Sequence, residues 1–186
     1  MCLVGNHDLG VLGAIPLHDF SSDAADAVAW TRGVLAPEAR AFLSELRPRA
    51  SAVGSELFHA SPRDPVWEYV LGAGAARTAL ELTSASVVLV GHSHVPLAYV
   101  LDGRDVHGGV ASGGMALELR DARWLLNPGS VGQPRDGDPR AAYLLVDLEA
   151  RSAVFRRVPY AVEETQREVL EQGLPPSLAE RLQLGA

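Results

Sequence analysis

Ser86-Val87-Val88-Leu89-Val90-Gly91-His92-Ser93-His94 is an apolar run that ends abruptly in a Gly-His-Ser-His turn. A short run rich in β-branched residues predicts a strand that is buried on both faces. The glycine and the polar residues that follow predict a turn that presents two histidine side chains at the end of this strand. Because ligands collect at strand ends in α/β sheets, this stretch predicts both the fold class and the place of a site.

Two other polar turns repeat this pattern elsewhere in the chain. Gly5-Asn6-His7-Asp8 directly follows the apolar run Met1–Val4, and His59 follows the predicted strand Ser55–Phe58. A single histidine at a strand end is more often a hydrogen-bonded residue than a metal ligand. Three such strand ends in one short chain favour a metal site.

The residue types in these turns indicate the kind of ion. Imidazole binds Zn, Fe, Ni and similar metals, whereas Asn6 can offer only its carbonyl oxygen, so the set predicts a borderline or hard divalent ion. On a turn, His92 and His94 can diverge toward two adjacent ions, as a two-metal phosphoryl-transfer centre requires. His18 and His107 lack such a setting, and we expect them to have surface or structural roles.

The remaining hydrophobic patterns predict one α/β domain over residues 1–186. It consists of a two-sheet β-sandwich flanked by helices, with an antiparallel meander in the second half. Residues 67–71 are read as a short helix or a loop. Helices are expected over 22–32, 37–46, 75–82, 162–170 and 178–182, and strands over 1–4, 55–58, 86–90, 97–101, 115–119, 124–126, 142–148 and 153–158.

Composition and charge restrict the class of protein. With 47% hydrophobic residues the chain can bury a core, and its apolar runs are too short to cross a membrane, so we expect a cytoplasmic protein. The net charge of −7 argues against a broad nucleic-acid surface. A small phosphorylated ligand remains compatible, because it responds mainly to charges within about 10 Å. The single cysteine, Cys2, cannot form an internal disulfide.

Four motifs in order carry a specific resemblance: Gly5-Asn6-His7-Asp8, His59-Ala60-Ser61-Pro62, Gly91-His92-Ser93-His94 and Asn127-Pro128-Gly129-Ser130-Val131-Gly132. The chain resembles the calcineurin-like metallophosphoesterase superfamily, in particular its small bacterial phosphodiesterases. The resemblance implies a helix-flanked β-sandwich with a dinuclear metal centre of Mn, Fe, Ni, Co or Zn at the strand ends, which hydrolyses phosphoesters.

The resemblance also implies roles for individual residues. Asn6, His59 and His92 would bind one ion, and His94 would bind the other. His7 would be the general acid that protonates the leaving alkoxide, and Asp8 the carboxylate that orients its imidazole.

Some of these residues have a structural alternative. Asp8 could instead cap a following helix. Arg135 could bind a substrate phosphate, or it could pair with Asp136 or Asp138 at the surface. Trp67 and Tyr69 could form a substrate wall, but core is the better interpretation, and Asn127–Gly132 is expected to shape a turn beside the site.

The family's pattern begins with Asp-x-His and then Gly-Asp-x-x-Asp, and neither precedes Gly5-Asn6-His7-Asp8 here. We therefore expect that an N-terminal βαβ portion is missing, and that residues 1–4 leave a sheet edge or apolar surface exposed. The absent motifs would supply most ligands of the second ion, so we expect at most one ion to be held well.

Two hypotheses follow from this. The first is an enzyme whose natural chain has roughly fifty more residues, a length guessed from one βαβ unit. The second is a catalytically inactive metal- or ligand-binding protein, or a subunit completed by another chain or by self-association into a homo-oligomer. For the 186 residues alone we expect negligible hydrolysis of bis-p-nitrophenyl phosphate with Mn²⁺.

Overall fold

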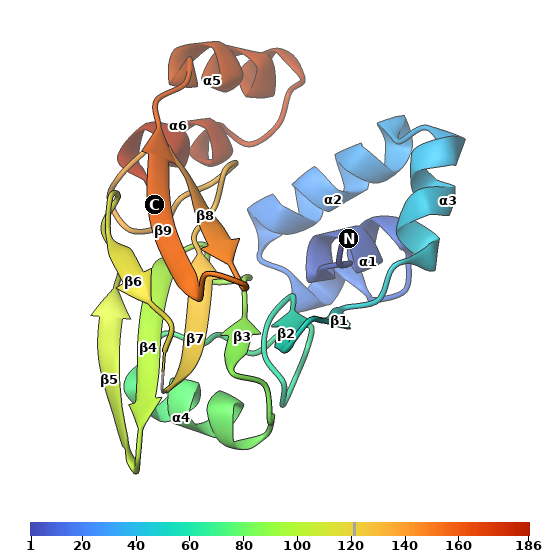
Figure 1. Cartoon of the computed structure of the whole chain (residues 1–186). Coiled ribbons are helices and arrows are strands. Elements are labelled where there is room, and N and C mark those ends of the chain that lie inside the picture. Colours follow the sequence, from blue (N-terminus) through green and yellow to red (C-terminus); the bar gives the residue numbers. More distant parts are fainter. Residues whose placement is uncertain (121) are drawn as a thin grey trace.

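Strands form two sheets in the computed structural model, which describes residues 1–120 and 122–186. A six-stranded sheet has the order β1-β2-β3-β7-β4-β5, and a three-stranded sheet has the order β6-β9-β8. Their strands are β1 (Arg49–Ala52), β2 (Ser55–Phe58), β3 (Val87–Leu89), β4 (Pro96–Asp102), β5 (Asp105–Val110), β6 (Ala116–Glu118), β7 (Arg123–Pro128), β8 (Ala141–Asp147) and β9 (Ser152–Val158). The predicted two-sheet α/β fold with flanking helices is confirmed (Figure 1).

The centre of the larger sheet is parallel. Ser55 of β2 pairs with Val87 of β3, which in turn pairs with Trp124 of β7. Parallel neighbours end at the same edge of a sheet, so the turns that follow β2 and β3 emerge side by side. The predicted site residues His59 and His92 follow these two strands.

Alternate residues of the central strands fill two separate cores, because successive side chains point to opposite faces of a sheet. Val88 and Leu125 pack against Ala76 and Leu80 of α4. Their neighbours in sequence, including Val87 and Leu126, pack against Phe155 of the smaller sheet and form the layer between the sheets. Burial on both faces explains why β3 is a continuous apolar run rather than an alternating one.

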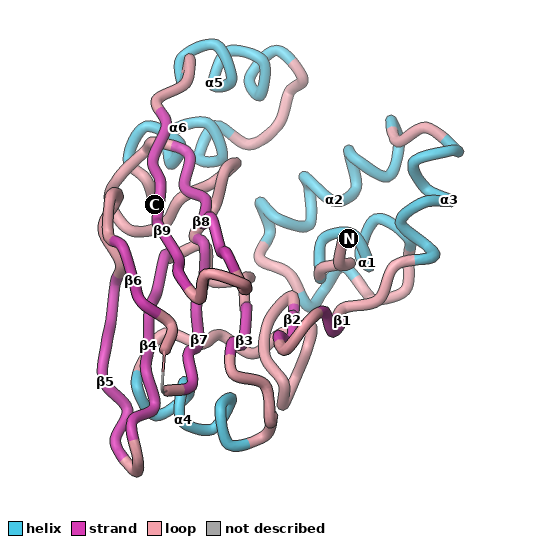
Figure 2. Tube along the Cα trace, viewed as in Figure 1, coloured by secondary structure: helices cyan, strands magenta, loops and turns pink. Residues whose placement is uncertain are grey.

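The helices surround the strands, as Figure 2 shows. They are α1 (Asn6–Leu12), the 3₁₀ turn η1 (Leu17–Asp19), α2 (Ser22–Val34), α3 (Pro37–Glu45), α4 (Ala73–Glu81), α5 (Val162–Glu171) and α6 (Pro176–Leu184). α1, α2 and α3 lie together beside β1 and β2, whereas α5 and α6 lie near one end of β8 and β9 (Figure 1). No helix in the described part of the chain is both long and apolar enough to span a bilayer.

Three details of the predicted fold are wrong. Residues 1–4 do not form a strand, because Val4 makes one backbone hydrogen bond, to the carbonyl of Arg47 (3.1 Å), rather than a ladder. The second half is not a single meander, since its strands are divided between the two sheets and β7 pairs parallel with β3. Two strands, β1 and β5, were not expected; Arg49, Asp105 and paired glycines obscure them in the sequence.

Candidate metal centre

Three predicted ligands converge at the edge where β2 and β3 end. Nε2 of His59 lies 3.0 Å from Oδ1 of Asn6 and 3.2 Å from Nδ1 of His92. A neutral His59 carries at most one proton on Nε2, so both contacts cannot be full hydrogen bonds at once. The three atoms therefore bring lone pairs together.

The spacing of these atoms fits a shared metal ion. Ligand atoms about 2.1 Å from one ion lie about 3.0 Å apart in octahedral and about 3.4 Å apart in tetrahedral coordination. Both contacts of His59 are of this size. Nε2 of His92 is buried and has no hydrogen-bond partner in the described residues. The cluster consists of two imidazoles and one amide. The described residues contain no group of three His, Cys, Asp or Glu side chains that could hold a metal ion.

Helix α1 positions Asn6, which the sequence alone placed on a loop. Gly5 precedes the helix, and Asn6 is its first residue. A Cβ atom on Gly5 would lie 2.6 Å from Cε1 of His59, so only glycine leaves room for the imidazole. The glycine of this motif is therefore required by close packing against a predicted ligand.

The turn that carries His92 and His94 has a strained backbone. Both histidines lie in the left-handed region, with φ of 61° and 59°, which side chains rarely adopt. The fully buried Asn127 holds this turn by donating to the carbonyl of Gly91 (2.9 Å) and to Oγ of Ser93 (2.9 Å). The Asn127–Gly132 segment thus lies beside the site, and it supports the neighbouring turn through the side chain of Asn127.

One ring nitrogen of His94 contacts the loop between β7 and β8. Its Nδ1 lies 2.8 Å from the carbonyl oxygen of Gln133, and a carbonyl can only accept, so Nδ1 is the protonated nitrogen. Nε2 of His94 then keeps its lone pair, which is the usual arrangement of a metal-binding imidazole. The sequence did not indicate Gln133, since it contributes a backbone atom.

Arg135 lies next to these histidines. Its backbone N–H donates to the carbonyl of His94 (3.2 Å), and its guanidinium donates to Oε1 of Gln133 (2.8 Å from Nη2). The alternative pairing of Arg135 is wrong, because Asp136 pairs with Arg157, and Asp138 pairs with Arg140 and lies near Arg157. The charge of Arg135 is therefore available to the site.

His7 and Asp8 occupy the first turn of α1. His7 is exposed, and its ring meets the edge of Phe20 at a centroid distance of 5.2 Å. Oδ2 of Asp8 accepts a hydrogen bond from the backbone N–H of Gly5 (2.8 Å), as in a helix cap. This is the alternative role considered for Asp8, which has no hydrogen bond to His7 among the described residues. Its charge nevertheless raises the pKa of His7.

The surroundings lower the pKa values of four imidazoles in and around the cluster. Burial, followed by neighbouring histidines, lowers the pKa of His59 and of His92 to about 4. Burial and the charge of Arg135 lower the pKa of His94. Loss of ring hydration and then Arg135 lower the pKa of His7 as well. Neutral imidazoles are the form that binds metals.

Aromatic rings border the cluster on one side. Tyr69 stacks on His92 with ring centroids 4.2 Å apart and 19° between the planes, and Trp67 meets both Phe20 and His92 edge-on. Tyr69 is 47% exposed, so the prediction that it belongs to the core is wrong. Its ring instead restrains the orientation of a predicted ligand.

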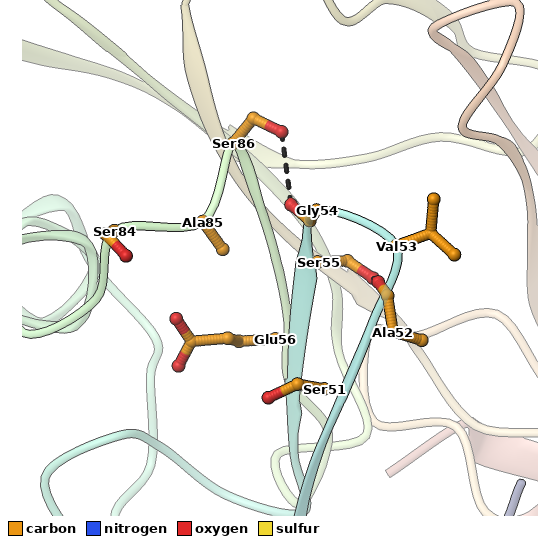
Figure 3. A pocket seen from close by; sticks show the side chains of 9 residues that line it. All are labelled: Ser51, Ala52, Val53, Gly54, Ser55, Glu56, Ser84, Ala85 and Ser86. Atoms are coloured by element: carbon orange, nitrogen blue, oxygen red, sulfur yellow. Dashed lines mark hydrogen bonds between the residues drawn. The ribbon is translucent and has the colours of Figure 1, made fainter.

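One hollow in the protein surface lies beside this cluster, and another lies at the β1–β2 turn. An apolar hollow of about 320 Å³, lined by Leu3, His59 and Gly91 among others, lies next to the cluster. A more polar, open depression of about 590 Å³ lies at the β1–β2 turn, where Ser86 donates to the carbonyl of Gly54 (Figure 3). The second hollow contains none of the predicted site residues, so the site is defined by the ligand cluster.

Comparison with known protein families identifies the superfamily of this chain. Residues 4–151 match the model of the calcineurin-like phosphoesterase superfamily domain. The chain belongs to this superfamily. The matched range contains every predicted site residue, from Asn6 to Arg135.

One similar protein and two similar solved structures match essentially the whole chain. An uncharacterised protein of Methanocaldococcus jannaschii, MJ0912, is 34% identical over 190 residues, which cover all of this chain and 75% of that protein. A crystal structure of a metallophosphoesterase from Sphaerobacter thermophilus is 37% identical, with a TM-score of 0.87 over 99% of this chain and 76% of that one. The hypothetical protein PH1004 of Pyrococcus horikoshii shares the fold at 18% identity, with a TM-score of 0.75 over 99% of this chain and 72% of that one.

Proposed function

We propose that this protein hydrolyses phosphoesters at a centre for two divalent metal ions. The observation that carries the proposal is the convergence of Asn6 Oδ1, His59 Nε2 and His92 Nδ1 at distances of 3.0 and 3.2 Å. These residues would hold one ion, and Nε2 of His94 would contribute to the second. Ions bound there would activate a water molecule as the nucleophile and stabilise the charge that develops on the phosphoryl group.

His7 is the proposed general acid. In its imidazolium form it donates a ring proton to the leaving oxygen as the phosphorus–oxygen bond breaks, and it regains a proton from solvent. A positioned acid contributes about 10²- to 10⁴-fold to the rate. Asp8 supports this role through its charge, which raises the pKa of His7 against the opposing effects of ring dehydration and Arg135.

Arg135 is the proposed phosphate-binding residue. Its guanidinium is next to His94 and does not pair with a carboxylate in the described residues. The planar fork of arginine matches two phosphate oxygens, so Arg135 can orient a phosphoester toward the cluster. The substrate in this proposal is a small phosphorylated molecule, consistent with the net charge of −7, which disfavours extended polyanions.

The two proposed ion sites differ in the number of ligands that the described residues supply. Three atoms converge for the first ion, whereas His94 is the one predicted ligand of the second. We therefore expect the first ion to bind well and the second weakly. Turnover by these 186 residues should be negligible at equimolar Mn²⁺, and a large excess is needed to populate the second site.

The test is hydrolysis of bis-p-nitrophenyl phosphate by the metal-stripped chain as Mn²⁺ is titrated from equimolar to large excess. The sequence alone predicts negligible hydrolysis with Mn²⁺, but the convergence of three ligand atoms leads us to expect p-nitrophenol release in excess Mn²⁺. This release should fall about 10²- to 10⁴-fold in His7→Ala. His107→Ala, which changes an exposed histidine on β5, is the matched control and should keep full activity. Binding of one ion with no hydrolysis at any Mn²⁺ concentration would instead support a non-catalytic binding protein.

A further inference from the structure

The loop between β7 and β8 fixes the position of His94. Its first half holds His94 through the carbonyl of Gln133, which lies 2.8 Å from Nδ1, and through the N–H of Arg135, which donates to the His94 carbonyl. The side chains of Arg135 and Gln133 are hydrogen-bonded to each other as well. Any movement of this loop would therefore move a predicted metal ligand and the proposed phosphate-binding arginine together.

Arg157 of β9 holds the second half of the same loop. Its side chain is only 4% exposed and forms an ion pair with Asp136, the residue next to Arg135. Nη1 of Arg157 donates to the carbonyl of Asp138 (3.2 Å) and to that of Arg140 (2.9 Å). One guanidinium thus binds three residues of the loop, from 136 to 140, and connects them to the smaller sheet.

The stem of Arg157 lies in a space made by a glycine. A Cβ atom on Gly113 would lie 2.7 Å from Cγ of Arg157, so the absence of a side chain at position 113 allows the arginine to lie flat there. The loop is also held from the other side, where the N–H of Gly137 donates to the carbonyl of Gly185 after α6 (2.9 Å). The conformation of the loop is therefore determined by contacts far from the metal ligands.

The energetics of the Arg157–Asp136 pair favour a positioning role over a stabilising one. Buried ion pairs lose hydration and often stabilise a fold no better than apolar residues of similar size. This pair also leaves Oδ1 of Asp136 buried without a partner in the described part of the chain, which adds a cost. The pair instead fixes the conformation of the loop, because the rigid guanidinium fork holds several acceptors at once.

We propose that Arg157 is a positioning residue that fixes the loop carrying Gln133 and Arg135, and thereby orients the His94 imidazole and the phosphate-binding guanidinium. The role of Arg135 rests on the proposed function. The orientation of His94 by the loop does not, so the two parts can be tested separately.

The experiment compares Arg157→Met with Arg123→Met in the full chain. Arg123 is a matched control, because its guanidinium also anchors a loop, donating to the carbonyls of Thr83 and Ala85, at the opposite end of β7 from the site. Two readouts are measured in metal-free protein: the ring ¹⁵N and ¹H signals of His94 by NMR, and the affinity for inorganic phosphate. Neither readout requires turnover.

We expect Arg157→Met to shift the His94 ring signals and to weaken phosphate binding about tenfold, as for loss of a charge-assisted contact. Arg157→Lys should restore part of both effects, since lysine keeps the charge but not the fork. Arg123→Met should change neither readout, even where it lowers the melting temperature equally. If Arg157→Met does not fold, Gly113→Ala displaces the arginine stem by steric contact and should give the same two changes.

Unchanged His94 signals in Arg157→Met or Gly113→Ala, or equal changes in Arg123→Met, would overturn the positioning role. A failure of the proposed function is seen differently. In that case the His94 signals still shift in Arg157→Met, but phosphate does not bind to the unmodified chain and no hydrolysis occurs in excess Mn²⁺.

Discussion

Nε2 of His59 lies 3.2 Å from Nδ1 of His92, although 33 positions separate the two residues in the chain. The parallel pairing of β2 and β3 explains this contact, because Leu57 and Leu89 are register partners. Two residues further along, the N–H of Gly91 still donates to the carbonyl of His59 (3.0 Å). His92 comes one residue later, and its left-handed backbone turns the imidazole back toward His59. The strand register and the strained turn together place the His59 and His92 side chains next to each other.

Gly5→Ala tests whether this arrangement depends on close packing at the start of α1. The new Cβ atom would lie 2.6 Å from Cε1 of His59, so the ring must shift from the position in which it contacts Asn6 and His92. We expect the affinity for Mn²⁺ or Zn²⁺ to fall by at least about tenfold, as for disturbed support of a metal ligand. Isothermal titration calorimetry measures it.

The matched control is Gly33→Ala in α2, where an added Cβ atom meets no other atom within 4 Å. This change should leave metal affinity unaltered and raise helix stability by about 0.5–1 kcal/mol. Equal metal affinity in Gly5→Ala and the unmodified chain would show that the glycine is not needed for the cluster.

The lowered pKa values of His59 and His92 predict how stability depends on pH in metal-free protein. Both pKa values fall from 6.5 to about 4, mainly through burial. Below pH 6.5 the unfolded chain takes up protons on these residues, whereas the folded chain does not. The stability from neutral burial is therefore complete above pH 6.5 and is lost as the pH falls toward about 4.

Urea unfolding at several pH values, in the presence of a chelator, measures this effect. We expect the free energy of unfolding to decrease steadily between pH 6.5 and about 4, and His92→Gln to reduce the slope. Asp138 does not interfere, because its pKa is lowered from 3.8 to about 2 by its hydrogen bond with Arg140 and so affects stability only at lower pH. A slope that is the same in His92→Gln as in the unmodified chain would contradict the prediction.

Asp8→Asn tests whether the Asp8 carboxylate affects His7 by its charge, in addition to capping α1. Loss of its charge removes the one influence that raises the pKa of His7, so that pKa should fall further below 6.5. NMR titration of the His7 ring in metal-free protein measures it. Asp26→Asn, on the exposed surface of α2, should have no such effect. A His7 pKa that does not change in Asp8→Asn would show that Asp8 acts only as a helix cap.

The sequence predicted the elements well where one physical pattern dominated. β3 is buried on both faces, and its continuous apolar run identified it within one residue at each end. The helix at Pro37 was also predicted correctly, since proline favours a first helical turn. In contrast, β5 contains Gly108 and Gly109, and it exists because β4 supplies hydrogen-bonding partners along its length. Such tertiary pairing leaves no local pattern in the sequence.

The predicted ligands could be recognised in the sequence because histidines follow apolar strands in short polar turns, and this pattern is visible in a few consecutive residues. The supporting residues were harder to recognise. Gln133 contributes a carbonyl oxygen to His94, and any residue type carries that atom. The role of Asp8 is ambiguous from the sequence, because a carboxylate three residues after Gly5 can cap a helix or face an imidazole, and the short helix α1 has no clear pattern of its own.

The proposed metal site is tested most directly by the metal-binding stoichiometry of the 186-residue chain, measured by calorimetric titration with Mn²⁺ or Zn²⁺ after removal of bound metal. We expect one well-held ion per chain, lost in His59→Ala and in His92→Ala and kept in His107→Ala. Binding that survives both His59→Ala and His92→Ala, or the absence of any bound ion, would contradict the assignment of Asn6, His59 and His92 as a metal site.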